Sequence, residues 1–133
     1  MQGTVFELVD AGPWVQVAAI RHGLPAGDLV AVQEALGLPL KELCAVIGVA
    51  ERIFTRRSAD NVRLDSAASE RLLRLVTLAG EVHTALGSKE LAVEWLTCHH
   101  DELNCRPITL VDTATGAAQV RRIIRAIEHG LPV

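Results

Sequence analysis

The sequence predicts an all-α fold, and three observations carry this prediction. Half of the 133 residues are hydrophobic, but only 3% are aromatic, and the apolar residues are mostly Leu, Ala and Val. Leu and Ala favour helices, whereas the aromatic residues that favour strands are scarce. Apolar residues also recur at spacings of three and four, in segments that Gly or Pro separates. No segment reads as a strand.

Four short helices are predicted in the first half of the chain, over residues 13–22, 28–36, 39–47 and 51–57. Each of the first three ends at a glycine, which suits the residue after a helix. The first and third begin at a proline, which suits the first turn. Asp28 is the candidate N-cap of the second helix. No element is predicted before residue 13.

The second half of the chain predicts the longest helix, from Asp65 or Ser66 to Leu86, followed by shorter ones. The long helix has an apolar stripe at helical spacing, made of Ala68, Leu72, Leu75, Val76, Ala79, Val82 and Leu86. Ser88 caps a helix that runs through Leu96, and Pro107 begins another short one. The last helix covers about 114–129.

Composition excludes several classes of protein. A chain that is half hydrophobic with a net charge of −3 is not disordered. No stretch approaches the roughly 20 apolar residues that a membrane span needs. Acids near the amino terminus argue against a secretory signal, so we expect a cytoplasmic protein. The three cysteines are an odd number, which argues against a disulfide framework.

Residues 40–57 predict a helix-turn-helix, because a short Gly-containing turn joins two short helices. Three arginines of the second helix lie within six residues that hold no acid. Arginine binds phosphates or guanine, and threonine reaches a base edge or a phosphate. We therefore expect four residues to contact DNA: Arg52, Thr55, Arg56 and Arg57. A solvated helix face is the alternative interpretation.

From Leu36 to Val133 the chain resembles the Xre/MbcA/ParS antitoxin family of bacterial toxin–antitoxin systems. One part of the resemblance is the run GVAERIFTRR with the later SERL at 69–72. The other part is a fixed order of residues, namely Leu86-Gly87, Trp95-Leu96, Pro107, Thr113, Gly116 and Gly130. The resemblance implies an N-terminal region with an Xre-like helix-turn-helix, over 1–87, and a small helical toxin-binding domain, over 88–133.

The resemblance also implies an antitoxin that neutralises a RES-domain toxin, a class that consumes NAD or uses it for ADP-ribosylation. The antitoxin would repress its own operon by binding operator DNA, as a homodimer or within a toxin–antitoxin hetero-oligomer. The expected toxin contacts are Arg121, Arg122 and Arg125 of the last helix and the tail that ends at Val133. A solvated face is again the alternative.

Two other functions remain open from the sequence. One is a helix-turn-helix transcriptional repressor without a toxin partner, whose last third dimerises or senses a small molecule. The other is a protein-binding helical module that no longer contacts DNA. We expect no enzyme and no cofactor, because the chain has no nucleotide-binding glycine motif, no P-loop and no nucleophile elbow.

A cluster of Cys98, His99, His100 and Cys105 contains ligand types that zinc favours. Adjacent histidines cannot easily aim at one ion, and no second ligand pair is present in the sequence. We therefore expect a turn with incidental thiols and no metal. Cys44 lies at an apolar position of the third helix and is expected in the core.

Overall fold

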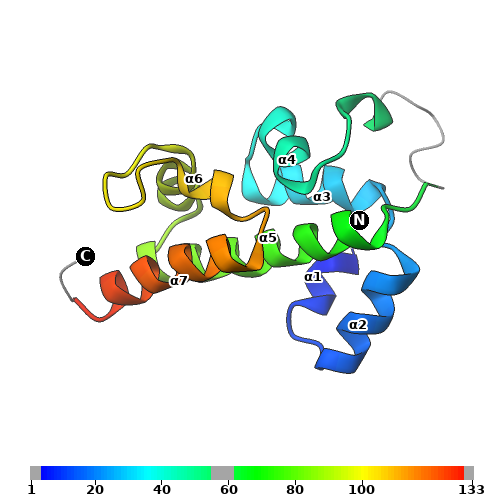
Figure 1. The fold of residues 1–133 in the computed structure, drawn as a ribbon, viewed down its shortest axis with the longest axis horizontal. Coiled ribbons are helices and arrows are strands. Elements are labelled where there is room, and N and C mark those ends of the chain that lie inside the picture. Colours follow the sequence, from blue (N-terminus) through cyan, green and yellow to red (C-terminus); the bar gives the residue numbers. More distant parts are fainter. Residues whose placement is uncertain (1–3, 55–61, 131–133) are drawn as a thin grey trace.

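The computed structural model describes residues 4–54 and 62–130, and within these ranges every regular element is helical (Figure 1). The α-helices are α1 (Thr4–Leu8), α2 (Pro13–His22), α3 (Gly27–Leu36), α4 (Leu40–Ile47), α5 (Ser66–Leu86), α6 (Lys89–Thr97) and α7 (Ala114–Glu128). The 3₁₀ turns in the described residues are η1 (Glu51–Phe54) and η3 (Pro107–Leu110). The predicted all-α fold is confirmed.

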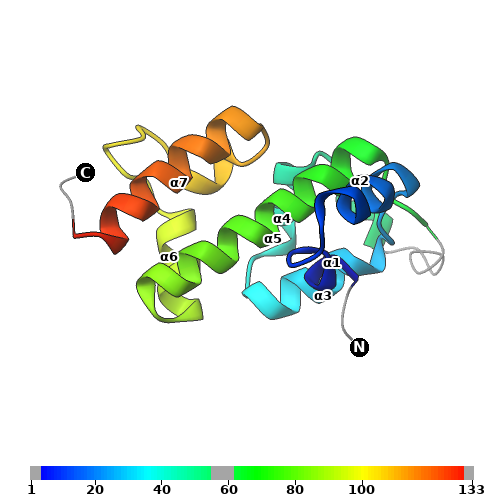
Figure 2. The ribbon, with the colours of Figure 1, turned by 90° about the horizontal axis from the view of Figure 1, so that it is seen from below.

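The long helix α5 crosses the middle of the molecule and contacts six other helices: α1, α2, α3, α4, α6 and α7. The helices before it surround its first half, with α1 and α2 on one side and α3 and α4 on the other (Figure 1). The helices after it, α6 and α7, lie along its second half (Figures 1 and 2). One apolar core therefore extends along α5.

The boundaries of α5 follow from its sequence. The Asp65 side chain accepts a hydrogen bond from the Ala68 N–H at 2.8 Å, as an N-cap does. Gly87 ends the helix in the left-handed conformation, with φ +91°. Six of the seven residues of the predicted apolar stripe are buried, and Leu86 is partly buried against the core. This element is as predicted.

The helices after α5 also begin where the sequence predicts. Ser88 accepts a hydrogen bond from the Leu91 N–H and caps α6. Thr113 accepts one from the Gly116 N–H and caps α7. Four apolar side chains of α7 are buried against the core or beside it: Ala117, Val120, Ile123 and Ile124.

The structure corrects two expectations about the amino-terminal part. Helix α1 was not predicted, although its Val5 is fully buried. Asp28 is not an N-cap, because α3 begins at Gly27 and Ala26 precedes it. The Asp28 carboxylate is buried and accepts a hydrogen bond from the Val5 N–H at 3.1 Å. The side chain that resembled a local cap instead joins two helices.

The fourth predicted helix, over 51–57, is described only as far as Phe54. Its described part is the 3₁₀ turn η1, which contacts α4. Such a turn is common at the ends of helices. Across the described ranges, none of the helices has both the length and the hydropathy that crossing a membrane requires.

Candidate functional site

The turn after α4 is held by the backbone of Gly48. This glycine has φ +76°, a left-handed conformation that side chains disfavour. Its N–H and that of Val49 both donate to the carbonyl of Cys44, at 2.9 and 3.1 Å. Leu43 and Ile47 are fully buried and fix α4 to the core. The chain therefore leaves α4 in a defined direction.

Arg71 of α5 lies over the same turn. Its Nη1 donates to the carbonyl oxygen of Ile47 at 3.5 Å. A Cβ on Gly48 would come within 2.9 Å of that nitrogen, so the glycine also provides the room for the arginine. A cation is favourable here because the carboxyl end of a helix carries partial negative charge. Through Arg71, α5 supports the turn between α4 and η1.

Of the four residues expected to contact DNA, the structure describes Arg52, which is exposed on η1. Thr55, Arg56 and Arg57 lie outside the described residues. The structure thus supports the position of the turn, and the contacts with DNA remain a prediction.

The three arginines of α7 do not share one role. Arg122 and Arg125 are exposed. Arg121 instead donates to Glu81 of α5: its Nε lies 2.9 and 3.1 Å from the two carboxylate oxygens, and its Nη2 lies 2.9 Å from one of them. Hydrogen bonding to Glu81 raises the pKa of Arg121, outweighing the burial that lowers it. Val133 lies outside the described residues.

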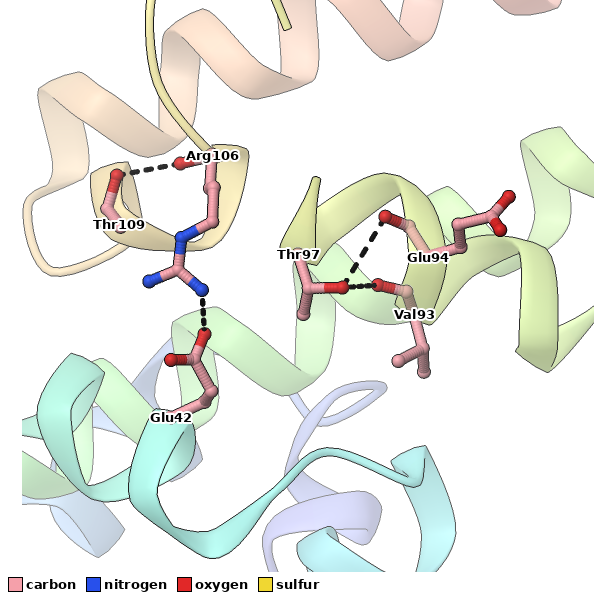
Figure 3. Close-up of polar contacts among 6 residues, drawn as sticks. All are labelled: Glu42, Val93, Glu94, Thr97, Arg106 and Thr109. Carbon is pink, nitrogen blue, oxygen red and sulfur yellow. Dashed lines mark hydrogen bonds and ion pairs between the residues drawn. The ribbon is translucent and has the colours of Figure 1, made fainter. Parts of the chain in front are cut away.

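A second ion pair joins the carboxyl-terminal region to the predicted helix-turn-helix (Figure 3). Arg106, just before η3, donates through Nη1 to the Glu42 carboxylate on α4 at 2.5 Å. The Arg106 carbonyl accepts a hydrogen bond from the Thr109 hydroxyl at 2.7 Å. Parts of the chain that are 64 residues apart are therefore in direct polar contact.

The cysteine–histidine segment forms a closed turn. His100 pairs with Cys105 in an isolated backbone bridge, and its Nε2 lies 2.8 Å from the Trp95 carbonyl oxygen. The rings of His100 and Trp95 are 4.8 Å apart between centroids. These contacts give His100 a structural role. Among the residues that the structure describes, no three His, Cys, Asp or Glu side chains gather in a way that could hold a metal ion.

Two family models match adjacent parts of this chain. The antitoxin Xre-like helix-turn-helix domain matches residues 15–76, which include α4, its turn and η1. The antitoxin Xre/MbcA/ParS C-terminal toxin-binding domain matches residues 79–130, which include α6, η3 and α7. The chain belongs to the Xre/MbcA/ParS antitoxin family.

Curated relatives agree with the family. The chain is 29% identical to an Antitoxin Xre of Yersinia enterocolitica, over 88% of this chain and 80% of the relative. It is 26% identical to an Antitoxin Xre of Photorhabdus laumondii, over 91% and 82% of the two chains. It is 27% identical to a protein named Prs ADP-ribosylating antitoxin from a Sphingobium species, over 92% and 84%.

The match to the Xre-like domain extends closer to the amino terminus than the resemblance seen in the sequence. The resemblance begins at Leu36, but the family match starts at residue 15, within α2 and inside the expected region 1–87. The helices α2 and α3 therefore belong to the antitoxin's helix-turn-helix domain. Their amphipathic pattern is weak, and α2 has no buried residue in the described chain. The residues before Leu36 therefore showed little resemblance to the family.

Sequence reasoning missed the charged residues that tie distant parts of this antitoxin together, of which Glu42 joins its two regions. Glu42, Glu81 and Arg71 each lie on a helix as charged side chains with partners far along the chain. No local pattern marks such pairs, because spacing along one helix reveals only partners three or four residues away.

Proposed function

We propose that this antitoxin binds and neutralises a RES-domain toxin that consumes NAD or uses it for ADP-ribosylation, and that it represses its own operon by binding operator DNA. The observation that carries the proposal is the succession of an Xre-like helix-turn-helix and a toxin-binding domain in one chain. A relative named as an ADP-ribosylating antitoxin supports the assignment of the toxin class.

On the toxin side, the proposed contacts are Arg122 and Arg125, which α7 exposes, with the tail ending at Val133. Arginine is enriched among the residues that dominate binding energy, and it pairs with carboxylates in a fixed geometry. Arg121 contributes indirectly, because its ion pair with Glu81 fixes α7 on α5. We place this face near the mouth of the toxin's active site, where occupancy would exclude NAD.

On the DNA side, Arg52, Thr55, Arg56 and Arg57 are the proposed contacts. The turn held by Gly48 and Arg71 comes just before Arg52, the first of these residues along the chain. Operators with two-fold symmetry require a paired binder, which we expect to be a homodimer or a toxin–antitoxin hetero-oligomer.

The test separates the two activities with reciprocal variants. Arg122→Ala with Arg125→Ala should weaken toxin binding roughly tenfold or more, measured by calorimetry, and leave operator affinity unchanged. Arg56→Ala with Arg57→Ala should weaken operator binding in a gel shift and reduce its salt dependence, while toxin affinity is retained.

A growth assay with the neighbouring gene tests the proposal as a whole. Expression of a RES-type toxin alone should arrest growth and deplete NAD, and co-expression of this chain should restore both. Failure to co-purify with that toxin would contradict the toxin assignment. Operator binding without any toxin partner would instead support the repressor interpretation.

A further inference from the structure

A cavity of about 70 Å³ lies between the end of α3, the second half of α5 and α6. Figure 1 shows α3 and α6 on the same side of α5. The inner wall of the cavity is apolar and consists of four buried side chains: Leu38, Ala79, Ala92 and Leu96. A short hydrocarbon chain gains free energy when it leaves water for a wall of this kind.

The exposed part of the lining carries two basic side chains, His83 of α5 and Lys89 of α6. A Cβ on Gly37 would lie 3.8 Å from the Cε of Lys89, so the lysine stem extends beside the turn that ends α3. Within the described ranges Lys89 forms no salt bridge, and no Asp or Glu is among the residues that line the cavity. An anionic group at this mouth therefore meets an ammonium without a competing carboxylate.

Both family matches contribute to the lining. Ala35 and Leu38 belong to the part that matches the helix-turn-helix domain, whereas His83 and Lys89 belong to the part that matches the toxin-binding domain. Small-molecule sites occur preferentially at such boundaries, and they combine an apolar pocket with a few polar groups that orient the ligand. None of the residues that we assign to DNA or toxin is in the described lining.

We propose that this cavity binds a small aliphatic carboxylate of about four carbons. An apolar cavity of about 150 Å³ holds benzene, so a cavity of half that volume has room for roughly three carbons. The alkyl chain occupies the apolar part. The carboxylate stays at the mouth, where it accepts hydrogen bonds from the ammonium of Lys89 and the ring of His83. Butyrate has both the length and the charge that this arrangement requires.

The shape and the charge of the cavity each select the ligand. Every methylene that enters the apolar part strengthens binding roughly fourfold, so butyrate binds more tightly than acetate. A chain as long as that of octanoate exceeds the volume. Because the mouth is exposed, the carboxylate keeps part of its hydration and avoids the large cost of burying a charge. Butyramide has nearly the same shape without the charge, and it loses the attraction to Lys89.

The test is a titration of the full chain, without toxin or DNA, with sodium butyrate, followed by two-dimensional NMR of the backbone amides. The shifts should saturate with a dissociation constant on the order of 1 mM, and they should be largest near Ala79, Ala92 and Leu96. Acetate should bind roughly tenfold more weakly and butyramide roughly fivefold more weakly. Sodium chloride at the same concentrations is the control for ionic strength.

Two variants test the charge and the volume separately. Lys89→Gln should weaken butyrate binding roughly fivefold. Its matched control is Lys41→Gln, because Lys41 is an exposed lysine of α4 outside the lining. Ala35→Leu enlarges an exposed residue of the lining and should weaken binding roughly tenfold by obstructing the cavity. Ala118→Leu, at an exposed position of α7, is the control for that change.

Circular dichroism shows whether each variant is folded, and the comparison of acetate, butyrate and octanoate on the unaltered chain tests the volume if Ala35→Leu does not fold. Shifts that do not saturate, or that sodium chloride reproduces, would overturn the inference. Equal affinity for butyrate and butyramide would do the same, as would unchanged affinity in folded Lys89→Gln. Saturating shifts confined to amides far from the cavity would also contradict it.

Discussion

Arg121 of α7 binds both carboxylate oxygens of Glu81 on α5, while the adjacent Arg122 hydrogen-bonds only weakly to Gln119 of its own helix, at 3.4 Å. Neighbouring arginines in the sequence thus point to different surroundings. One fixes the last helix to the central one, and the other remains exposed on the face that we assign to the toxin. The first prediction follows from this difference.

Arg121→Ala should lower the free energy of unfolding by about 1 kcal/mol, since a two-point arginine–carboxylate pair is stronger than an ordinary surface pair. The side chains of Arg121 and Glu81 are 29% and 33% exposed, so water screens part of the attraction. Urea denaturation provides the measurement. Arg122→Ala is the control and should change the free energy by less than about 0.5 kcal/mol. Equal losses in the two variants would refute the assignment.

The ion pair between Glu42 and Arg106 should show measurable coupling. Because the pair is partly exposed, a double-mutant cycle of Glu42→Gln and Arg106→Gln should give a coupling free energy of about 0.5–1 kcal/mol. High salt should reduce this coupling. Strictly additive losses in unfolding free energy would mean that the contact between the two regions contributes nothing to stability.

Cys44 should make stability depend on alkaline pH. Burial, and secondarily the charge of Glu51, raises the pKa of this thiol from its ordinary 9.0 to about 11. Between these values the unfolded chain loses the thiol proton and the folded chain keeps it. Stability should therefore be complete below pH 9, fall as pH rises from 9, and level off above about 11.

Denaturation midpoints measured across this range check the sign of the effect. Cys44→Ala should remove the part of the decline that the thiol causes, at the cost of a small cavity. In native protein a thiol reagent should modify the exposed Cys98 long before the buried Cys44. Rapid modification of Cys44 in the folded chain would contradict its burial.

Two glycines within helices should respond oppositely to alanine. A Cβ at Gly116 would lie 2.1 Å from the Leu110 carbonyl oxygen, a backbone atom that cannot move aside cheaply. Gly116→Ala should therefore destabilise the protein by about 1–3 kcal/mol. A Cβ at Gly80 of α5 would meet nothing within 4 Å. Gly80→Ala should stabilise it by about 0.5–1 kcal/mol, because alanine favours the helix. Thermal unfolding distinguishes the two, and a shift of the same sign in both would contradict the argument.

Where the determinants are local, the sequence predicted the structure well. The predicted caps at Asp65 and Ser88 satisfy backbone groups of the next turn, as Thr113, which was not predicted as a cap, does for α7. The apolar stripe of α5 keeps the helical spacing over many turns, and a pattern sustained over that length identifies a helix clearly. The same two signals define α7.

Where the determinants are distant, the sequence could not predict the arrangement. Helix α1 has five residues, too few for a period, and it is held by a hydrogen bond from Val5 to Asp28 across 23 positions. Asp28 is of a residue type that often caps helices, but its carboxylate binds the Val5 N–H of another helix. The pairing of Arg121 with Glu81 likewise depends on how α7 packs against α5. Only the folded chain brings these groups together.

The junction between the two family matches falls at residues 76–79, inside α5, where Val76, Leu78 and Ala79 are buried. An expression plasmid that divides the gene at this junction would sever a continuous helix and leave each fragment with an uncovered apolar edge. Such fragments should aggregate, even though each contains a complete family match. A fragment designed to isolate either activity should therefore contain all of Ser66–Leu86.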